Sequence, residues 1–179
     1  MKTTEVQVRL AEPDEWAVVR DVRLAALADA PDAFASTAGR EAGQTEAEWR
    51  ARIAALPWFL AWYQSQPAGL VAMFPEEPRA AQEPQPAGQT TTPPDWHLVS
   101  MWVGPRARGL GVADRLVTAV LGRARAAGAA RVTLWVAVGN DRARGFYQRM
   151  GFVPTGRRQI FPRAGTTDLD EEEFACPLG

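Results

Sequence analysis

Residues 103–113 are Val103-Gly104-Pro105-Arg106-Ala107-Arg108-Gly109-Leu110-Gly111-Val112-Ala113. In this stretch an apolar strand ends, glycines turn the backbone, and an alanine- and arginine-rich helix begins. Glycine lets a backbone approach a ligand closely, and the first turn of a helix presents unpaired N–H groups at the positive end of its dipole. The stretch therefore predicts a binding site for a phosphate-bearing ligand.

The chain around this stretch predicts an α/β (α+β) fold. Apolar patterning indicates strands over residues 6–10, 58–64, 70–74, 96–103, 132–138, 153–161 and 172–178. It indicates helices over residues 13–29, 45–56, 112–127 and 140–150, with an irregular segment at 30–44 and a hairpin turn at 65–69. The unit from Trp96 to Val138 should contain parallel strands, whereas the early hairpin is antiparallel. We expect a mixed, mostly antiparallel sheet of about six to seven strands, flanked by helices.

Length and composition point to one domain over residues 1–179. Six of the twenty residues from Pro75 to Pro94 are proline, which predicts a disordered insertion within that domain. The single cysteine, Cys176, permits no internal disulfide and is expected to be buried in the last strand. Because no apolar run at the N-terminus has the length of a signal peptide and no later apolar run approaches a membrane span, we expect a cytoplasmic protein.

The net charge of −1 gives no general attraction to nucleic acid or to an anionic membrane, and we expect neither as a partner. Charge is nevertheless uneven along the chain. Between Met101 and Met150 there are nine arginines against two acids, an excess of seven positive charges around the glycines. This local excess agrees with an anionic ligand at the opening stretch.

Two familiar phosphate sites do not match the sequence. A nucleoside triphosphate P-loop needs lysine and a hydroxyl residue after its second glycine, and both are missing here. A dinucleotide fingerprint needs a third glycine, where this chain has Asp114, and an acid after the next strand, where it has Val138-Gly139-Asn140.

A third pattern does match. Residues 108–113 resemble the R/Q-x-x-G-x-G/A signature of the GNAT superfamily of N-acetyltransferases. A second signature of that family is similar to Asn140-x-x-Ala143-x-x-Phe146-Tyr147-x-x-x-Gly151-Phe152. The register that begins at Arg106 also satisfies the first signature. Arg108 is preferred, because it places Pro105 and Leu116 where the family pattern has them.

The resemblance implies the acyl-CoA N-acyltransferase fold of a bacterial, single-domain enzyme. It implies acetyl-CoA as co-substrate, with no metal. The pyrophosphate of acetyl-CoA is expected at the backbone N–H groups of Gly109, Leu110, Gly111, Val112 and Ala113, with Arg108 supplying charge nearby. The remaining expected contacts are Met101 and Val103 on the pantetheine arm, and Asn140 with Ala143 on the opposite side.

The implied reaction is direct attack of a primary amine on the thioester. A backbone N–H near Val103 would hold the oxyanion, and Tyr147 would protonate the departing thiolate. The sequence does not identify the general base, because residues 96–103 contain no glutamate. His97 lies at the far end of that strand, and we favour a structural or surface role for it. Glu41, Glu46, Glu48 and a water chain are the alternatives.

The acceptor is expected to be a small-molecule or peptide amine. Its pocket should be formed by residues 34–45, the hairpin 58–74 and the loop 157–170. Homodimers are common among the proteins that the chain resembles. The alternative function is a non-catalytic acyl-CoA-binding sensor, which would bind the donor without transferring the acetyl group.

Overall fold

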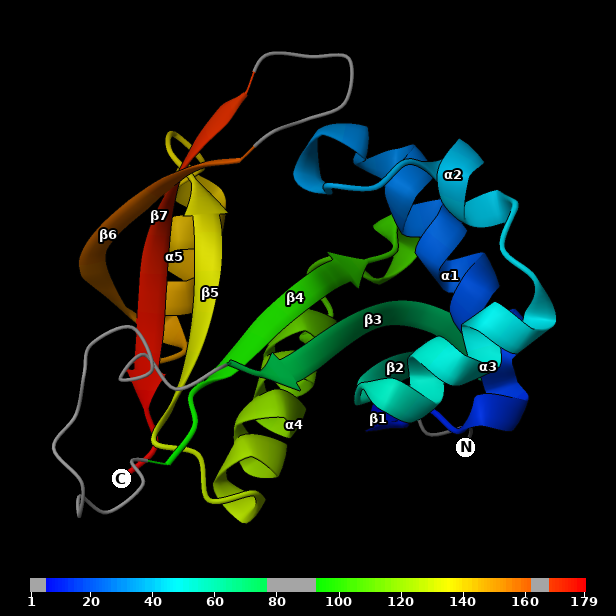
Figure 1. Ribbon diagram of the computed structural model, residues 1–179, viewed down its shortest axis with the longest axis horizontal. Coiled ribbons are helices and arrows are strands. Elements are labelled where there is room, and N and C mark those ends of the chain that lie inside the picture. Colours follow the sequence, from blue (N-terminus) through cyan, green and yellow to red (C-terminus); the bar gives the residue numbers. More distant parts are fainter. Residues whose placement is uncertain (1–5, 77–92, 162–167) are drawn as a thin grey trace, which may run out of the picture.

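The computed structural model describes residues 6–76, 93–161 and 168–179 and places seven strands in one mixed sheet (Figure 1). The sheet order is β1-β2-β3-β4-β5-β7-β6, and among these strands only β4 and β5 pair in parallel. The strands are β1 (Gln7–Leu10), β2 (Trp58–Tyr63), β3 (Gln66–Pro75), β4 (Trp96–Val103), β5 (Arg131–Ala137), β6 (Val153–Phe161) and β7 (Leu169–Pro177). The predicted fold class is confirmed.

Helices cover both faces of the sheet. The helices α1 (Trp16–Asp29) and α3 (Glu46–Ala55) pack on one face of β2 and β3, around a core that includes Trp49 and Leu60. The helices α4 (Val112–Ala126) and α5 (Asp141–Arg149) lie behind the sheet in Figure 1 and bury Leu116 and Phe152 against the other face. These two cores fix β4, the central strand, between the two helical layers.

Local signals in the sequence position the helix ends as predicted. Thr45 and Glu48 form a reciprocal capping box at the start of α3. Gly128 follows α4 with a φ of 72°, and Gly151 follows α5 with a φ of 92° and is succeeded by the fully buried Phe152. A left-handed residue after a helix favours glycine, so both terminators are explained by backbone conformation.

The hairpin between β2 and β3 differs from the prediction. Its turn consists of Gln64 and Ser65, both with positive φ, and β3 already begins at Gln66. Gly69 lies within β3, and this position needs glycine because a Cβ there would stand 2.6 Å from the carbonyl oxygen of Trp102. The glycine therefore reflects the close approach of β4 and not a turn.

One further expectation is refined, and another is not tested by the described residues. The segment expected to be irregular contains a one-turn helix, η2 (Pro31–Ala33), and a short helix, α2 (Ala38–Ala42), whose first turn is capped by Thr37. The proline-rich insertion expected at 75–94 lies outside the described residues except at its two ends.

The single histidine and the single cysteine are both buried. His97 places Nδ1 2.7 Å from the hydroxyl of Thr133 and packs its ring against Phe74, so the structural role expected for it holds and the surface location does not. Cys176 is buried in β7, and burial raises the pKa of its thiol, which disfavours the reactive thiolate.

Candidate functional site

The sheet opens at its centre, between β4 and β5. These strands pair only at Trp96 with Val132 and at His97 with Thr133, and beyond this point they diverge (Figure 1). On the other side β4 carries an extra residue in its pairing with β3, and Ser100 at this bulge has a φ of 59°. A left-handed serine in a central strand is strained, and such strain tends to be found at functional sites.

The glycine loop lies at the end of β4. After the one-turn helix η4 (Pro105–Ala107), Gly109 and Gly111 both adopt positive φ, and Gly111 is the N-cap residue of α4. Because the N-cap is a glycine, no side chain caps α4, and its first N–H groups are left for an anion, as a phosphate site requires.

Arg108 is held in place beside this loop. Its Nε donates to the carbonyl oxygen of Val103 over 3.1 Å, and its guanidinium pairs with Asp29 at the end of α1. Trp102 Nε1 donates to the same carboxylate over 2.9 Å. Both hydrogen bonds lower the pKa of Asp29 and keep it ionised, and the one from Trp102 has the larger effect. The loop is therefore tied to α1.

The opposite side of the loop is formed by α5. Asn140 caps this helix, since its Oδ1 accepts a hydrogen bond from the backbone N–H of Ala143 over 3.1 Å, which leaves the amide hydrogens of Asn140 for a ligand. About two helical turns after Asn140, Tyr147 packs its ring edge-on against Phe146 and Phe152. Burial raises the pKa of Tyr147, so its hydroxyl stays protonated throughout the neutral range.

These elements enclose a cavity of about 1030 Å³, which we call the glycine-loop cavity. Ten residues predicted from the sequence line it, namely Met101, Val103, Arg108, Gly109, Gly111, Val112, Ala113, Asn140, Ala143 and Tyr147. Leu110, the other predicted residue, is exposed and is not part of its lining. Arg106 lines a separate groove with Tyr63, which agrees with the register that begins at Arg108.

A second cavity, of about 540 Å³, occupies the opening between β4 and β5, and we call it the strand-gap cavity. It shares Met101, Asn140 and Tyr147 with the glycine-loop cavity. It shares Ser100 and Glu171 with a third cavity. The three cavities thus form a series that passes through the sheet from one side to the other.

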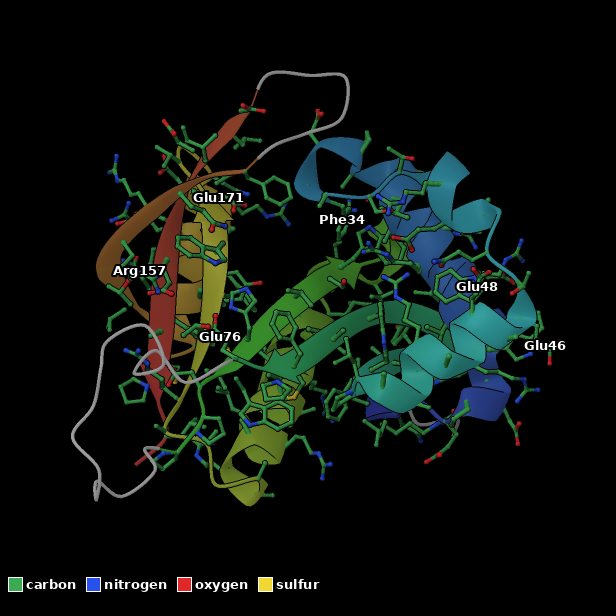
Figure 2. All side chains as sticks on the ribbon, viewed as in Figure 1. Phe34, Glu46, Glu48, Glu76, Arg157 and Glu171 are labelled. Carbon is green, nitrogen blue, oxygen red and sulfur yellow. The ribbon has the colours of Figure 1, made fainter. Side chains whose placement is uncertain are left out.

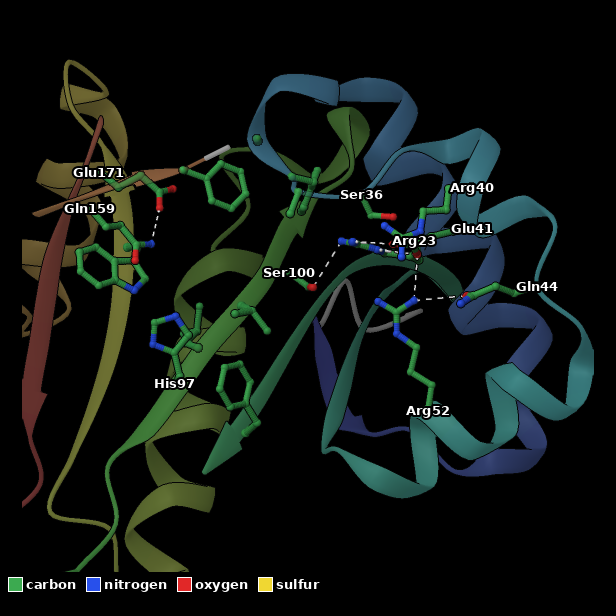
Figure 3. A pocket seen from close by; sticks show the side chains of 18 residues that line it. Arg23, Ser36, Arg40, Glu41, Gln44, Arg52, His97, Ser100, Gln159 and Glu171 are labelled. Carbon is green, nitrogen blue, oxygen red and sulfur yellow. Dashed lines mark hydrogen bonds and ion pairs between the residues drawn. The ribbon is translucent and has the colours of Figure 1, made fainter. Parts of the chain in front are cut away.

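The third cavity, of about 660 Å³, lies between the sheet and α1, α2 and α3, and we call it the arginine cavity (Figure 3). At its wall the buried Glu41 accepts two hydrogen bonds from Arg23, at 2.9 and 3.0 Å, and one from Arg52, at 3.0 Å. Burial alone would raise the pKa of Glu41, but pairing with the two arginines outweighs it and holds the pKa below its ordinary value.

None of the three glutamates considered as the general base fits that role. Glu46, at the outer edge of the molecule in Figure 2, pairs with Arg50, and Glu48 is the capping-box partner of Thr45 at the start of α3. Both are exposed, and neither lines any of the three cavities. Glu41 does line the arginine cavity, but its two oxygens are occupied by Arg23 and Arg52. A carboxylate held in its ionised form by two cations is a poor acceptor of a proton.

Glu171, in β7, is the acid that sequence reasoning missed. It is half-buried, lines both the strand-gap and the arginine cavities, and accepts a hydrogen bond on Oε2 from Gln159 over 2.9 Å. Within the described residues no hydrogen bond reaches its Oε1. The only signal is a run of four acids, Asp170 to Glu173, and the face on which each side chain lies cannot be assigned before the register of β7 is known.

Some of the residues that we expect to form the acceptor pocket line the arginine cavity. Residues 33–36, 40, 41 and 44 line the arginine cavity, as do Gln159 and Phe161. Of the hairpin 58–74, only Phe74 reaches it. Residues 162–167 of the expected loop lie outside the described residues.

Comparisons with known proteins point to one family. The family model described as "Acetyltransferase (GNAT) family" matches residues 24–152. No curated protein matches the chain by sequence. The described helices are all too short or too polar to cross a lipid bilayer.

Solved structures share the fold over almost the whole chain. A GNAT family acetyltransferase from Streptococcus pneumoniae is 22% identical, with a TM-score of 0.71, and the match covers 98% of this chain and 100% of that one. NAA60 from Arabidopsis thaliana, solved with acetyl-CoA, is 15% identical, with a TM-score of 0.72 and coverage of 97% and 99%. The protein yncA from Salmonella typhimurium, solved with its cofactor acetyl-CoA, is 15% identical, with a TM-score of 0.66 and coverage of 98% and 95%. At these identities the likeness is evidence for the fold alone.

Proposed function

The chain belongs to the GNAT family of acetyltransferases, and from this premise we propose that it transfers the acetyl group of acetyl-CoA to a primary amine of a small molecule or peptide. The observation that carries the proposal is the series of three cavities through the opening between β4 and β5. A donor bound on one side of the sheet and an acceptor bound on the other would meet in that opening, where Tyr147 and Glu171 both line the cavity.

The glycine-loop cavity suits the donor. The pyrophosphate of acetyl-CoA would accept hydrogen bonds from the N–H groups at the start of α4, between Gly109 and Ala113. Arg108, which is paired with Asp29, lies beside them. The pantetheine arm would run along the edge of β4 at Met101 and Val103, where β5 has left the strand unpaired. Acetyl-CoA is also the ligand found with the similarly folded yncA and NAA60.

We assign each residue around the opening a separate role in the reaction. Glu171 takes a proton from the substrate ammonium, which frees the nitrogen lone pair. As nitrogen bonds to the thioester carbonyl carbon, a backbone N–H near Val103 holds the oxyanion. The carbon–sulfur bond would then break, and Tyr147 would give its proton to the departing thiolate. The second proton that the attacking nitrogen loses would restore the Tyr147 hydroxyl, and Glu171 would release the first proton to solvent. The acetamide and free coenzyme A are the products.

Replacing Ala113 by glutamate tests the donor site. The new carboxylate lies at the start of α4 and faces the expected pyrophosphate, so the Kd for acetyl-CoA should rise about 10- to 100-fold. An acid in the first helical turn is favourable for the helix, so the melting temperature should not fall. Isothermal titration calorimetry measures the first effect and thermal unfolding the second.

Thr118→Glu is the matched control, because Thr118 is exposed on the same helix and lies outside the lining of the cavity. If the Ala113→Glu protein binds acetyl-CoA as tightly as the Thr118→Glu protein does, acetyl-CoA does not bind at this site.

Replacing Tyr147 by phenylalanine tests the proton donor. The ring contacts with Phe146 and Phe152 are retained, so stability should change little, whereas kcat should fall about 100-fold. The thiolate of a more acidic thiol leaves more easily without a proton. With an acetyl thioester of such a thiol, Tyr147→Phe should therefore lower kcat less than it does with acetyl-CoA. Tyr63→Phe, at the other tyrosine of the chain, is the control; equal rates for the two variants would exclude Tyr147 from the reaction.

A further inference from the structure

The arginine cavity has an unbalanced charge on one of its walls. Figure 3 shows Arg23, Arg40 and Arg52 gathering around Glu41 from α1, α2 and α3. Three cations against one carboxylate leave two positive charges at the wall. Arg23 and Glu41 are only 4% and 3% exposed and neutralise each other, so the excess positive charge lies on Arg52 and on the exposed Arg40.

The ion pair that the fold needs accounts for only part of this cluster. The two-point contact between Arg23 and Glu41 already joins α1 to α2. Arg52 adds a second cation to the same carboxylate, and its guanidinium is held over the rings of Trp49 and Trp58 at 5.1 and 5.0 Å. Arg40 is exposed at the cavity and makes no ion pair with any described residue. Two arginines are thus left to attract a further anion.

The facing wall has the opposite character. Glu171 and Gln159 lie across the cavity from the arginines (Figure 3), next to the opening that leads toward Tyr147. Aromatic side chains complete the lining, namely Phe34, Phe74, Trp135 and Phe161. The cavity is therefore positive at one end, negative at the end near the sheet opening, and apolar between.

We propose that the acceptor is an amino acid or a similar amine that also carries a carboxylate, with its carboxylate at Arg40 and Arg52 and its amine at Glu171. This inference rests on the proposed function, because it names the acceptor class of that same site. Arginine binds carboxylates through two parallel hydrogen bonds, which would orient the amine toward the sheet opening. Polyamines are excluded as acceptors, since a second cation would meet the arginines.

The test is a binding measurement on the protein saturated with coenzyme A. N-acetyl derivatives of phenylalanine, leucine, methionine and glutamate are titrated beside their methyl esters, which have nearly the same shape but lack the α-carboxylate charge. At least one free acid should bind about 10- to 100-fold more tightly than its ester, and Arg40→Gln should remove most of that preference. Arg20→Gln, outside the cavity on α1, should retain it.

Three results would overturn the inference: acids and esters that bind equally, acids that do not bind at all, or N-acetylspermidine binding more tightly than every acid. Arg40 is exposed on a short surface helix, so Arg40→Gln is expected to keep the melting temperature of the parent protein. Acetyl transfer is measured separately. Transfer to amines without a preference for carboxylates would leave the proposed function standing, whereas absent transfer with selective acid binding would reject the function and retain the site.

Discussion

Replacing Glu171 by glutamine is expected to lower kcat by about 100-fold or more at pH 7. An alkyl amine with a pKa of about 10.4 is almost entirely protonated at that pH, and the amide of glutamine cannot remove its proton. The substitution keeps the size of the side chain and an oxygen for Gln159, so acetyl-CoA binding should be unchanged. Steady-state kinetics with a saturating amine measure the effect.

The pH profile gives this prediction a second readout. In the Glu171→Gln protein, the rate should climb steadily as pH rises toward the pKa of the amine, because the variant depends on amine that is already neutral. Glu172→Gln is the matched control, since its side chain pairs with Arg144 and lies outside the cavities. A Glu171→Gln protein with the rate and pH profile of the Glu172→Gln protein would show that the base lies elsewhere.

Replacing Glu41 by alanine is expected to lower the free energy of unfolding by about 3–5 kcal/mol. Glu41 is the one described carboxylate that pairs with both Arg23 and Arg52, and removing it leaves the buried Arg23 without its charge partner. Urea unfolding measures the loss. Glu46→Ala removes an exposed ion pair and should cost at most about 1 kcal/mol.

The same ion pair predicts a dependence of stability on acid. The arginines hold the folded-state pKa of Glu41 below its unfolded value of about 4.3, so its contribution is fully present above that value and is lost as pH falls through the folded pKa. The stability difference between the parent and Glu41→Gln proteins should therefore narrow below about pH 4. A constant difference down to pH 2, or a Glu41→Ala protein as stable as the parent, would contradict this view of the cluster.

The lining of the glycine-loop cavity, the proposed donor site, could be predicted because its determinants are local. The conformations of Gly109 and Gly111 and the cap formed by Asn140 depend on neighbouring residues, and Tyr147 follows from the helical spacing after that cap. The same holds for the helix ends at Thr45 and Gly128. Short-range physical chemistry determines each of these features, so sequence spacing alone was sufficient.

Most of the arginine cavity, the proposed acceptor site, could not be predicted, because long-range packing assembles it. Arg23, Arg40 and Arg52 come from three helices and meet only when α1, α2 and α3 pack on the sheet. Glu171 faces the cavity while Glu172 faces away, a choice made by the pairing of β7 with β5 and β6. The turn predicted at Gly69 is wrong for the same reason, since the constraint on this glycine comes from Trp102 in another strand.

The most direct test of the central claim is the release of free thiol from acetyl-CoA by the parent protein in the presence of a panel of amines, among them free amino acids. We predict release that requires an amine, saturates with its concentration, and is matched mole for mole by the acetylated amine in a mass spectrum. Acetyl-CoA that binds without any thiol release on the whole panel would contradict the account and favour a sensor. Absence of acetyl-CoA binding would contradict both.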